Sequence, residues 1–282
     1  MFYLVFFLVL IVLAVLCRSF YEITHFVIKR YEFQNKAVLG LVKILYISDL
    51  HENCFGKENE RLVQTVLREK PDCIIIGGDL IIGKEKKVKI DVGLEFLKKI
   101  EKICPVLYNF GNHETRVCET DKFQSYLEEV KKLDIVLLNN KGIHLNFKGT
   151  KIYFWGIELG KECYKKGEYI VGENPFLEAK EDEIKVLIAH NPNFLKEYAE
   201  WQPDYVFSGH NHGGIVRLPV INGVISTDKR FFPKYSYGVY RENQTAMILS
   251  GGAGAHTIKF RLFNESEIVA VQITEDTRNK KL

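Results

Sequence analysis

The hydrophobic and polar positions divide the chain into three regions. Residues 1–17 form one continuous apolar run, residues 18–42 are mixed, and from residue 43 onward short apolar runs alternate with polar clusters. Short apolar runs bounded by polar residues are typical of buried strands. Five of them end in a cluster that contains Asp, His or Asn: 43–47 before 48–51, 73–76 before 77–79, 106–110 before 111–114, 184–189 before 190–192, and 205–207 before 208–212.

Helical patterns separate the first three runs. Residues 58–70 and 88–102 carry apolar side chains at helical spacing, as at Leu62, Val63, Val66 and Leu67. Strands that alternate with helices pair in parallel through right-handed crossovers, and such sheets bind ligands at the carboxyl ends of their strands. The five polar clusters are therefore expected to meet at one edge of a sheet.

Beyond residue 140 the apolar runs are shorter and helical patterns are few. The runs are 151–155, 246–249, 258–262 and 267–273. This change predicts a second, largely antiparallel sheet that faces the first.

Residues 43–274 are predicted to form one domain, because no internal repeat, proline-rich linker or low-complexity tract interrupts them. Residues 18–42 are expected to be a connector with some strand character at 26–33, and residues 275–282 a charged tail. With a net charge of +3 and lysines scattered among glutamates, the chain has no basic face that would indicate nucleic-acid binding. The sequence gives no prediction of the oligomeric state.

The apolar run at residues 1–17 is at the lower limit for a helix that spans a bilayer. No Lys or Arg precedes it and no Ala-x-Ala site follows it, which disfavours a cleaved signal peptide. We therefore predict an uncleaved single-pass anchor in the cell membrane. The positive residues all follow the run, so the positive-inside rule places the remainder in the cytoplasm: Arg18, Lys29, Arg30 and Lys36.

Cysteine usage points to the same compartment. Five of the six cysteines follow the apolar run, an odd number with no CxxC pair. This pattern suits a reducing environment. Cys73 and Cys104 border apolar runs and are expected to be core residues.

The segment 208–212, Ser-Gly-His-Asn-His, indicates metal chemistry. On an extended backbone the side chains of His210 and His212 would point apart, so they would serve two neighbouring metals better than one. Gly209 and the pair Gly213 and Gly214 would let the backbone approach a crowded site.

The polar residues at the strand ends form a larger candidate set. Five of the eight histidines lie in these clusters. Taken singly, each would more often be a structural or surface residue, whereas carboxylates and imidazoles that converge at one sheet edge are what a metal site requires. The set is Asp49, His51, Asp79, Asn112, His113, His190, His210 and His212.

The order Asp-x-His, Gly-Asp, Gly-Asn-His-Glu, His, Gly-His-x-His resembles the calcineurin-like metallophosphoesterase superfamily, over residues 43 to about 274. The resemblance implies an α/β fold, a four-layer α/β/β/α sandwich of two mixed sheets. It also implies an enzyme in which two divalent metals about 3.5 to 4 Å apart activate a water molecule for attack on phosphorus. Manganese is the favoured metal, and iron, zinc and nickel remain possible.

The resemblance assigns a role to each motif residue. The first metal would take Asp49, His51 and His212. The second would take Asn112, His190 and His210, with Asp79 bridging both. His113 is similar to the catalytic histidine of the superfamily, which binds no metal and protonates the leaving group or stabilises the developing charge.

Other features of the sequence indicate which branch of the superfamily the chain resembles. Residues 78–81, Gly-Asp-Leu-Ile, lack the Asp-Arg that follows the Gly-Asp of protein Ser/Thr phosphatases. Residues 212–219, residues 261–264 and the anchor resemble a bacterial membrane-associated branch with enzymes for lipid-linked pyrophosphates such as UDP-2,3-diacylglucosamine. A phosphate-containing, lipid-linked substrate at the membrane is therefore expected. A soluble nucleotide or cyclic-nucleotide phosphodiesterase and a non-catalytic metal-binding scaffold remain as alternatives.

Two loops have open interpretations. Residues 215–235 alternate apolar residues with Arg217, Lys229, Arg230 and Lys234. They form either a loop packed on the sheet or a substrate wall beside His212, with Arg217 as the candidate substrate contact. The glycine-rich residues 251–254 are a candidate loop for close approach to the metals.

Overall fold

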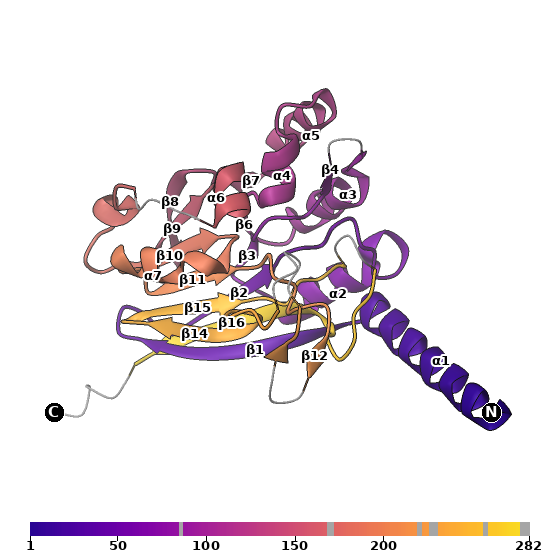
Figure 1. The fold of residues 1–282 in the computed structure, drawn as a ribbon. Helices are drawn as coiled ribbons and strands as arrows, with labels where there is room; N and C mark the ends of the chain where they lie inside the picture. The colour runs from indigo at the N-terminus through magenta and orange to yellow at the C-terminus, as the bar shows by residue number, and fades with distance from the viewer. Residues whose placement is uncertain (85–86, 168–171, 219–221, 226–230, 256–258, 277–282) are drawn as a thin grey trace.

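The computed structural model describes residues 1–84, 87–167, 172–218, 222–225, 231–255 and 259–276. Lys229, Arg230 and most of the expected tail lie outside the described residues. Two six-stranded sheets form the body of the fold, and a long N-terminal helix, α1, projects from it (Figure 1).

The first sheet has the order β1-β16-β2-β3-β6-β7. In this sheet β2, β3, β6 and β7 pair in parallel, as predicted from the alternation of strands and helices. The crossovers pass through α2, α3, α4 and α5. The bounds are β1 Phe26–Asn35, β16 Ser266–Glu275, β2 Leu41–Ile47, β3 Cys73–Ile76, β6 Val106–Tyr108, β7 Ile135–Leu137, α2 Glu60–Glu69, α3 Asp91–Ile100, α4 Asn112–Val117 and α5 Asp121–Lys131.

The residues expected to be a connector take part in this sheet. Strand β1 pairs in parallel with β16 over its whole length, from Phe26 opposite Ser266 to Asn35 opposite Glu275. The predicted strand character at 26–33 is thus present, but the ordered fold begins before residue 43. A physical reason is that β1 covers the backbone donors and acceptors of β16, which would otherwise be an open sheet edge.

The second sheet has the order β14-β15-β11-β10-β9-β8. The prediction that it is largely antiparallel is wrong, because β9, β10, β11 and β15 pair in parallel and only the outermost pairs are antiparallel. The bounds are β8 Lys141–Phe147, β9 Thr150–Ile157, β10 Ile184–Ala189, β11 Tyr205–Ser208, β14 Gly238–Glu242 and β15 Thr245–Leu249.

Crossover segments explain the parallel pairing of the second sheet. Short helices lie in the connections from β9 to β11: α6 Lys161–Lys166, η2 Pro175–Glu178, η3 Pro192–Phe194 and α7 Leu195–Glu200. Parallel neighbours need such long connections, whereas a tight hairpin joins antiparallel ones. The run 267–273 belongs to β16 of the first sheet, and of the run 258–262 the described part contributes a single bridge, from Leu262 to Val216.

Alternation along the central strands builds the layers. In β2, Ile44 and Tyr46 face the second sheet, whereas Leu45 and Ile47 face the helices. One apolar cluster fills the space between the sheets, a second lies under α2, α3 and α5, and a third lies on the outer face of the second sheet with α7. The four-layer α/β/β/α sandwich is therefore confirmed.

Helix α1 spans Phe2–Thr24 and continues past the predicted apolar run. Its most apolar 18-residue window has a mean hydropathy of 2.6 and is 6% buried. Within the described residues it is the one helix long and apolar enough to cross a membrane, and an anchor or a signal sequence would have this form. Two residues of its last turns are buried, Ser19 and Glu22.

Two small hairpins complete the part of the fold that surrounds the strand ends. Strand β4, Ile82–Lys84, pairs with β5, Lys87–Lys89, shortly after the cluster at 77–79. Strand β12, Arg217–Leu218, pairs with β13, Asn222–Gly223, after the cluster at 208–212. Both hairpins thus follow loops that carry candidate ligands.

Candidate metal centre

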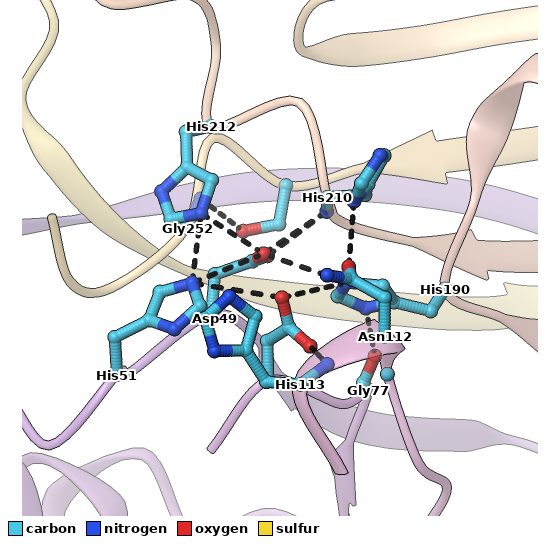
Figure 2. Close-up of polar contacts among 12 residues, drawn as sticks. Asp49, His51, Gly77, Asn112, His113, His190, His210, His212 and Gly252 are labelled. Atoms are coloured by element: carbon cyan, nitrogen blue, oxygen red, sulfur yellow. Dashed lines mark hydrogen bonds and ion pairs between the residues drawn. The ribbon is translucent and has the colours of Figure 1, made fainter. Parts of the chain in front are cut away.

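The polar residues predicted from the five strand ends lie together in the structure. They follow β2, β3, β6, β10 and β11, and each is at most 7% exposed. Figure 2 labels seven of them around a common centre, with His51 and His212 on one side and His190 and His210 on the other. The eight residues are Asp49, His51, Asp79, Asn112, His113, His190, His210 and His212.

Two groups of possible ligands match the two predicted metal positions. Ligand atoms of Asp49, His51 and His212 lie within 4.8 Å of one another, as do those of Asp79, His190 and His210. The Asn112 side chain joins the second group, with its amide oxygen 2.9 Å from Nδ1 of His210. The sequence prediction grouped these residues in the same way.

Asp79 lies between the two groups. Its Oδ2 is 3.6 Å from Nε2 of His51 in the first group and 3.3 Å from Nε2 of His190 in the second. Ligand atoms of His51, Asp79 and His113 form a third cluster in the same region. This position suits a carboxylate that bridges two cations.

Backbone carbonyls fix the orientation of two imidazoles. Nδ1 of His190 donates to the carbonyl oxygen of Gly77 at 2.7 Å, and Nδ1 of His212 donates to that of Gly254 at 3.2 Å. Each bond holds the proton on Nδ1 and turns Nε2 toward the carboxylates, which is the usual arrangement behind a metal-binding histidine. Nε2 of His190 is buried and has no hydrogen-bond partner in the described residues.

The distance between two other imidazole nitrogens also fits a cation. Nε2 of His51 and Nε2 of His212 are 3.0 Å apart, and their rings are stacked. Ligands bound at about 2.1 Å to one ion and at right angles to each other would be about 3 Å apart. The donor set of oxygens and imidazole nitrogens therefore fits a binuclear site for divalent cations.

The carboxylates and imidazoles of the centre shift one another's pKa values. Burial alone would lower the pKa of His190, but the carboxylates of Asp79 and Asp49 outweigh it and raise the pKa to about 10. Burial opposes ionisation of Asp79, yet the neighbouring imidazoles of His190 and His113 hold its pKa well below the ordinary value. Burial raises the pKa of Asp49. These buried carboxylates thus demand positive charge, which protons or metal ions can supply.

His113 lies beside this centre, with its proton placement set by the β4–β5 hairpin. Its Nδ1 accepts a hydrogen bond from the backbone nitrogen of Gly83 at 3.0 Å, so the neutral ring carries its proton on Nε2. A Cβ at Gly83 would come within 2.0 Å of the His113 carbonyl oxygen. Such a ring can donate a proton, in agreement with the predicted general-acid role, which stays a prediction.

Glu114 is a central residue to which the sequence analysis assigned no role. Its carboxylate accepts hydrogen bonds from the backbone nitrogens of Asp79 and Leu80 and from the hydroxyl of Tyr108, at 2.9, 2.8 and 3.0 Å. Burial and the charge of Asp79 raise its pKa to about 7. The sequence did contain a signal for Glu114: it lies three residues after Gly111, which is the position of the acidic partner in a helix capping box.

The loop of His210 and His212 differs from the prediction in its backbone. Both residues have positive φ, 71° and 48°, so the segment is a turn and not an extended strand. Gly209 lets this turn approach Asp49 closely, because a Cβ there would lie 2.3 Å from Oδ2 of Asp49. The two rings nevertheless lie in separate groups, His212 with Asp49 and His51, and His210 with Asp79 and His190.

The glycine-rich loop 251–254 approaches the centre closely, as expected. A Cβ at Gly252 would lie 2.9 Å from Cβ of Asp49, and the backbone nitrogen of Gly254 donates to the carbonyl oxygen of Asp49 at 2.7 Å. Larger residues would push the Asp49 loop away.

Arg217, the predicted substrate contact, is buried behind the His212 loop. Its Nε donates to the carbonyl oxygen of Gly213 at 3.2 Å, its Nη1 is 3.7 Å from Glu267, and its guanidinium stacks on the ring of Tyr237. Arg217 is only 7% exposed, so this geometry favours a role in holding the His212 loop and disfavours contact with substrate. In the same region Leu218 and Phe231 are exposed.

A family model for the calcineurin-like phosphoesterases matches residues 42–214. The chain belongs to the calcineurin-like phosphoesterase family. Its enzymatic character as a metallophosphoesterase follows from this match and from the names of its relatives. The branch of UDP-2,3-diacylglucosamine hydrolases, by contrast, stays a prediction.

Similarity to individual known proteins covers most of the chain. The uncharacterised metallophosphoesterase YkoQ of Bacillus subtilis strain 168 is 23% identical over 82% of this chain and 83% of its own length. Phosphodiesterase YaeI of Escherichia coli K12 is 26% identical over 67% of this chain and 68% of its own. A solved structure, TT1561 of Thermus thermophilus, aligns at a TM-score of 0.49 with 14% identity over 75% of this chain and 90% of that chain.

Proposed function

We propose that the protein is a two-metal phosphoesterase that hydrolyses a phosphoester or pyrophosphate bond of a membrane-associated, lipid-linked substrate. The observation that carries the proposal is the place of Asp79 between two buried groups of ligands. The first cation would be held by Asp49, His51 and His212, and the second by Asn112, His190 and His210.

The chain's own residues would divide the chemistry as follows. Two bound divalent cations, manganese being favoured, supply Lewis-acid activation of water and neutralise phosphate charge. Asp79 would contact both cations, and Glu114 fixes the backbone of the Asp79 loop through a hydrogen bond from the Asp79 nitrogen. His113 carries a proton on Nε2 and gives it to the leaving oxygen, with Gly83 maintaining that tautomer.

Helix α1 supports the membrane part of the proposal. A 23-residue helix rises about 34 Å, enough to cross the hydrocarbon core of a bilayer. Four cationic residues follow its apolar portion, which favours a cytoplasmic catalytic domain. A tether of this kind raises the effective concentration of substrates in the same membrane and gives no advantage for soluble ones.

Reconstituted full-length protein tests the substrate class. Vesicles that contain both enzyme and a lipid pyrophosphate would be compared with mixtures in which enzyme and lipid are in separate vesicles. Each rate would be normalised to hydrolysis of a soluble chromogenic phosphodiester with manganese present. We expect hydrolysis of the lipid to be at least about 10-fold faster in the shared vesicles. Equal rates in both arrangements, together with efficient hydrolysis of soluble nucleotides, would overturn the lipid-linked assignment.

One alternative has independent support. The Escherichia coli relative is named a phosphodiesterase, so this chain could act on soluble diesters, including nucleotides or cyclic nucleotides. The same experiment separates the two functions, because a soluble diester would be hydrolysed without regard to vesicle composition. A non-catalytic scaffold is disfavoured because the eight predicted site residues are all present and converge.

A further inference from the structure

The last two turns of α1 are bonded to the segment 261–264. Oγ of Ser19 accepts a hydrogen bond from the backbone nitrogen of Arg261 at 3.1 Å, and Oε2 of Glu22 accepts one from that of Asn264 at 3.1 Å. Ser19 is 3% exposed and Glu22 is 1% exposed, whereas the rest of α1 is largely open. A buried carboxylate on an apolar helix is costly unless it has partners, and here the partners belong to this segment and to Arg18.

The same segment holds the loop that carries His212. Nδ2 of Asn264 donates to the carbonyl oxygen of His212 at 2.8 Å and to that of Gly214. Asn264 is 1% exposed, so these bonds are shielded from water. The backbone of His212 therefore rests on a side chain whose own backbone is bonded to α1.

Arg261 connects the segment to the glycine loop behind His212. This side chain is 2% exposed, and burial lowers its pKa to about 10. Its Nη2 donates to three carbonyl oxygens at 2.9, 3.1 and 2.5 Å, those of Gly251, Gly252 and Gly254. The last of these oxygens also accepts the bond from Nδ1 of His212. Arg261 thus sets the position of the acceptor that orients the His212 ring.

A second connection runs from α1 to the other histidine of the same group. Nδ2 of Asn53 donates to the carbonyl oxygen of Ile23 at 3.1 Å and to that of Ala253 at 3.3 Å. Asn53 is two residues beyond His51. The contacts of α1 therefore lead to His51 and His212, which belong to the first group. In the second group, His190 is oriented by Gly77, a residue with no part in these connections.

We propose that Ser19 and Glu22 are positioning residues for the first metal, acting through Arg261 and Asn264 on His212. The end of the candidate membrane helix is then a structural part of one half of the metal centre, and among the described contacts it reaches the other half only indirectly, through the loop that His210 shares with His212 and through Asp49. This inference rests on the proposed two-metal function. It predicts that loosening the end of α1 weakens one metal site selectively.

Manganese binding to the full-length protein in detergent tests the inference. Metal would be removed with a chelator, and Mn²⁺ titrated back by calorimetry into wild type, Glu22→Ala, Glu22→Gln and Ser19→Ala. We expect Glu22→Ala to weaken one of two Mn²⁺ affinities by about 10-fold or more, the usual range for residues behind a metal ligand, and to leave the other within about 2-fold. Glu22→Gln keeps an oxygen for the backbone nitrogen of Asn264, so its loss should be smaller.

Thr24→Ala is the matched control for Ser19→Ala. The Thr24 hydroxyl lies at the same end of α1 and bonds to the helix carbonyls of Phe20 and Tyr21 and to His25, not to the segment 261–264. The Thr24→Ala change should therefore leave both Mn²⁺ affinities unchanged. The thermal midpoint of each metal-free variant would be measured in parallel, so that general loss of stability is recognised.

The possible outcomes of these titrations distinguish the inference from the proposed function. Unchanged affinities in Glu22→Ala, or an equal loss at both sites that follows the metal-free thermal midpoint, would overturn the inference. If Glu22→Ala does not fold, Ser19→Ala and Glu22→Gln decide by the same criterion. Wild type that binds fewer than two Mn²⁺ ions would instead overturn the proposed two-metal function, so the two failures can be told apart.

Discussion

At the scale of single residues, Asp79 contacts residues of both ligand groups and the backbone of His113. Its Oδ2 faces His51 and His190, its Oδ1 accepts a hydrogen bond from the backbone nitrogen of His113 at 2.8 Å, and its own nitrogen is held by Glu114. A change at this side chain removes the shared negative charge while the backbone contacts can persist.

We expect Asp79→Asn to lose activity and at least one bound metal, because a neutral amide cannot neutralise two cations. Elemental analysis of purified protein and a phosphodiester assay measure both effects. Asp182→Asn is a suitable control, since Asp182 is exposed and pairs with Lys151 at the surface. Retention of two metals or of full activity in Asp79→Asn would contradict the bridging role.

His113→Ala should separate metal content from rate. The side chain is predicted to donate a proton and not to bind metal, so metal content should stay at the wild-type value while the catalytic rate falls by about 10² or more. His144→Ala is the control, because His144 pairs with Glu183 at an outer strand. If metal is lost together with activity, His113 is a ligand.

At the scale of elements, Glu114 joins the loop after β3 to the first turn of α4. Its carboxylate accepts several backbone and side-chain donors in a buried position, and hydrogen bonds to charged groups each contribute about 1.5 to 3 kcal/mol. Because a glutamine has one acceptor oxygen in place of two, Glu114→Gln should lower the free energy of unfolding by about 2 kcal/mol or more.

Urea denaturation of the metal-free protein measures this loss. Glu128→Gln is the control, because Glu128 is exposed and pairs only with Lys131 at the surface in the described residues. A loss in Glu114→Gln no larger than that in the control would show that the carboxylate does not secure the loop.

The strand ends were readable from the sequence because each buried strand is a continuous apolar run that stops at polar residues. The same periodicity gave α2 and α3. It could not show that β9, β10, β11 and β15 pair in parallel, because the short helices in the connections from β9 to β11 have weak patterns. Nor could it show that β1 pairs with β16, which joins residues from opposite ends of the chain.

The candidate site was predicted almost completely as a set of residues, but not the contacts that support it. The side chains of Asp49 and His212 stand out by type, whereas Glu114, Arg261 and Asn264 act through backbone carbonyls and nitrogens that no pattern of residue types reveals. Arg217 illustrates the opposite case. Its type suggested phosphate binding, and only its burial against Glu267 and Tyr237 shows a different set of partners.

At the scale of the whole molecule, α1 projects from the two sheets on the side where it meets residues 261–264 (Figure 1). The sheets, the metal centre and this helix are therefore arranged so that the centre lies near the point where the chain would leave a bilayer.

Thiol labelling tests the proposed cytoplasmic orientation. Cys17 and Cys54 are the exposed cysteines, so the variant Cys17→Ala leaves Cys54 exposed beside the half-buried Cys104, Cys118 and Cys163, all of them in the catalytic domain. A membrane-impermeant maleimide should fail to label this variant in intact cells and should label it in inside-out membrane vesicles. Labelling in intact cells, or a mature protein that begins after residue 17, would contradict an uncleaved anchor with a cytoplasmic domain.

The pairing of β1 with β16 has a consequence for biosynthesis. Phe26 lies opposite Ser266, and Ser19 and Glu22 bind backbone groups of Arg261 and Asn264, so the N-terminal elements meet their partners only after nearly all of the chain has been made. During translation α1 and β1 are made first, and β1 stays without its partner strand until β16 has been made. Contacts of such large sequence separation form late in folding. The candidate ligand His212 therefore receives this support late in folding, and a chain that stops before residue 261 would lack the contacts of Arg261 and Asn264 that hold the His212 loop.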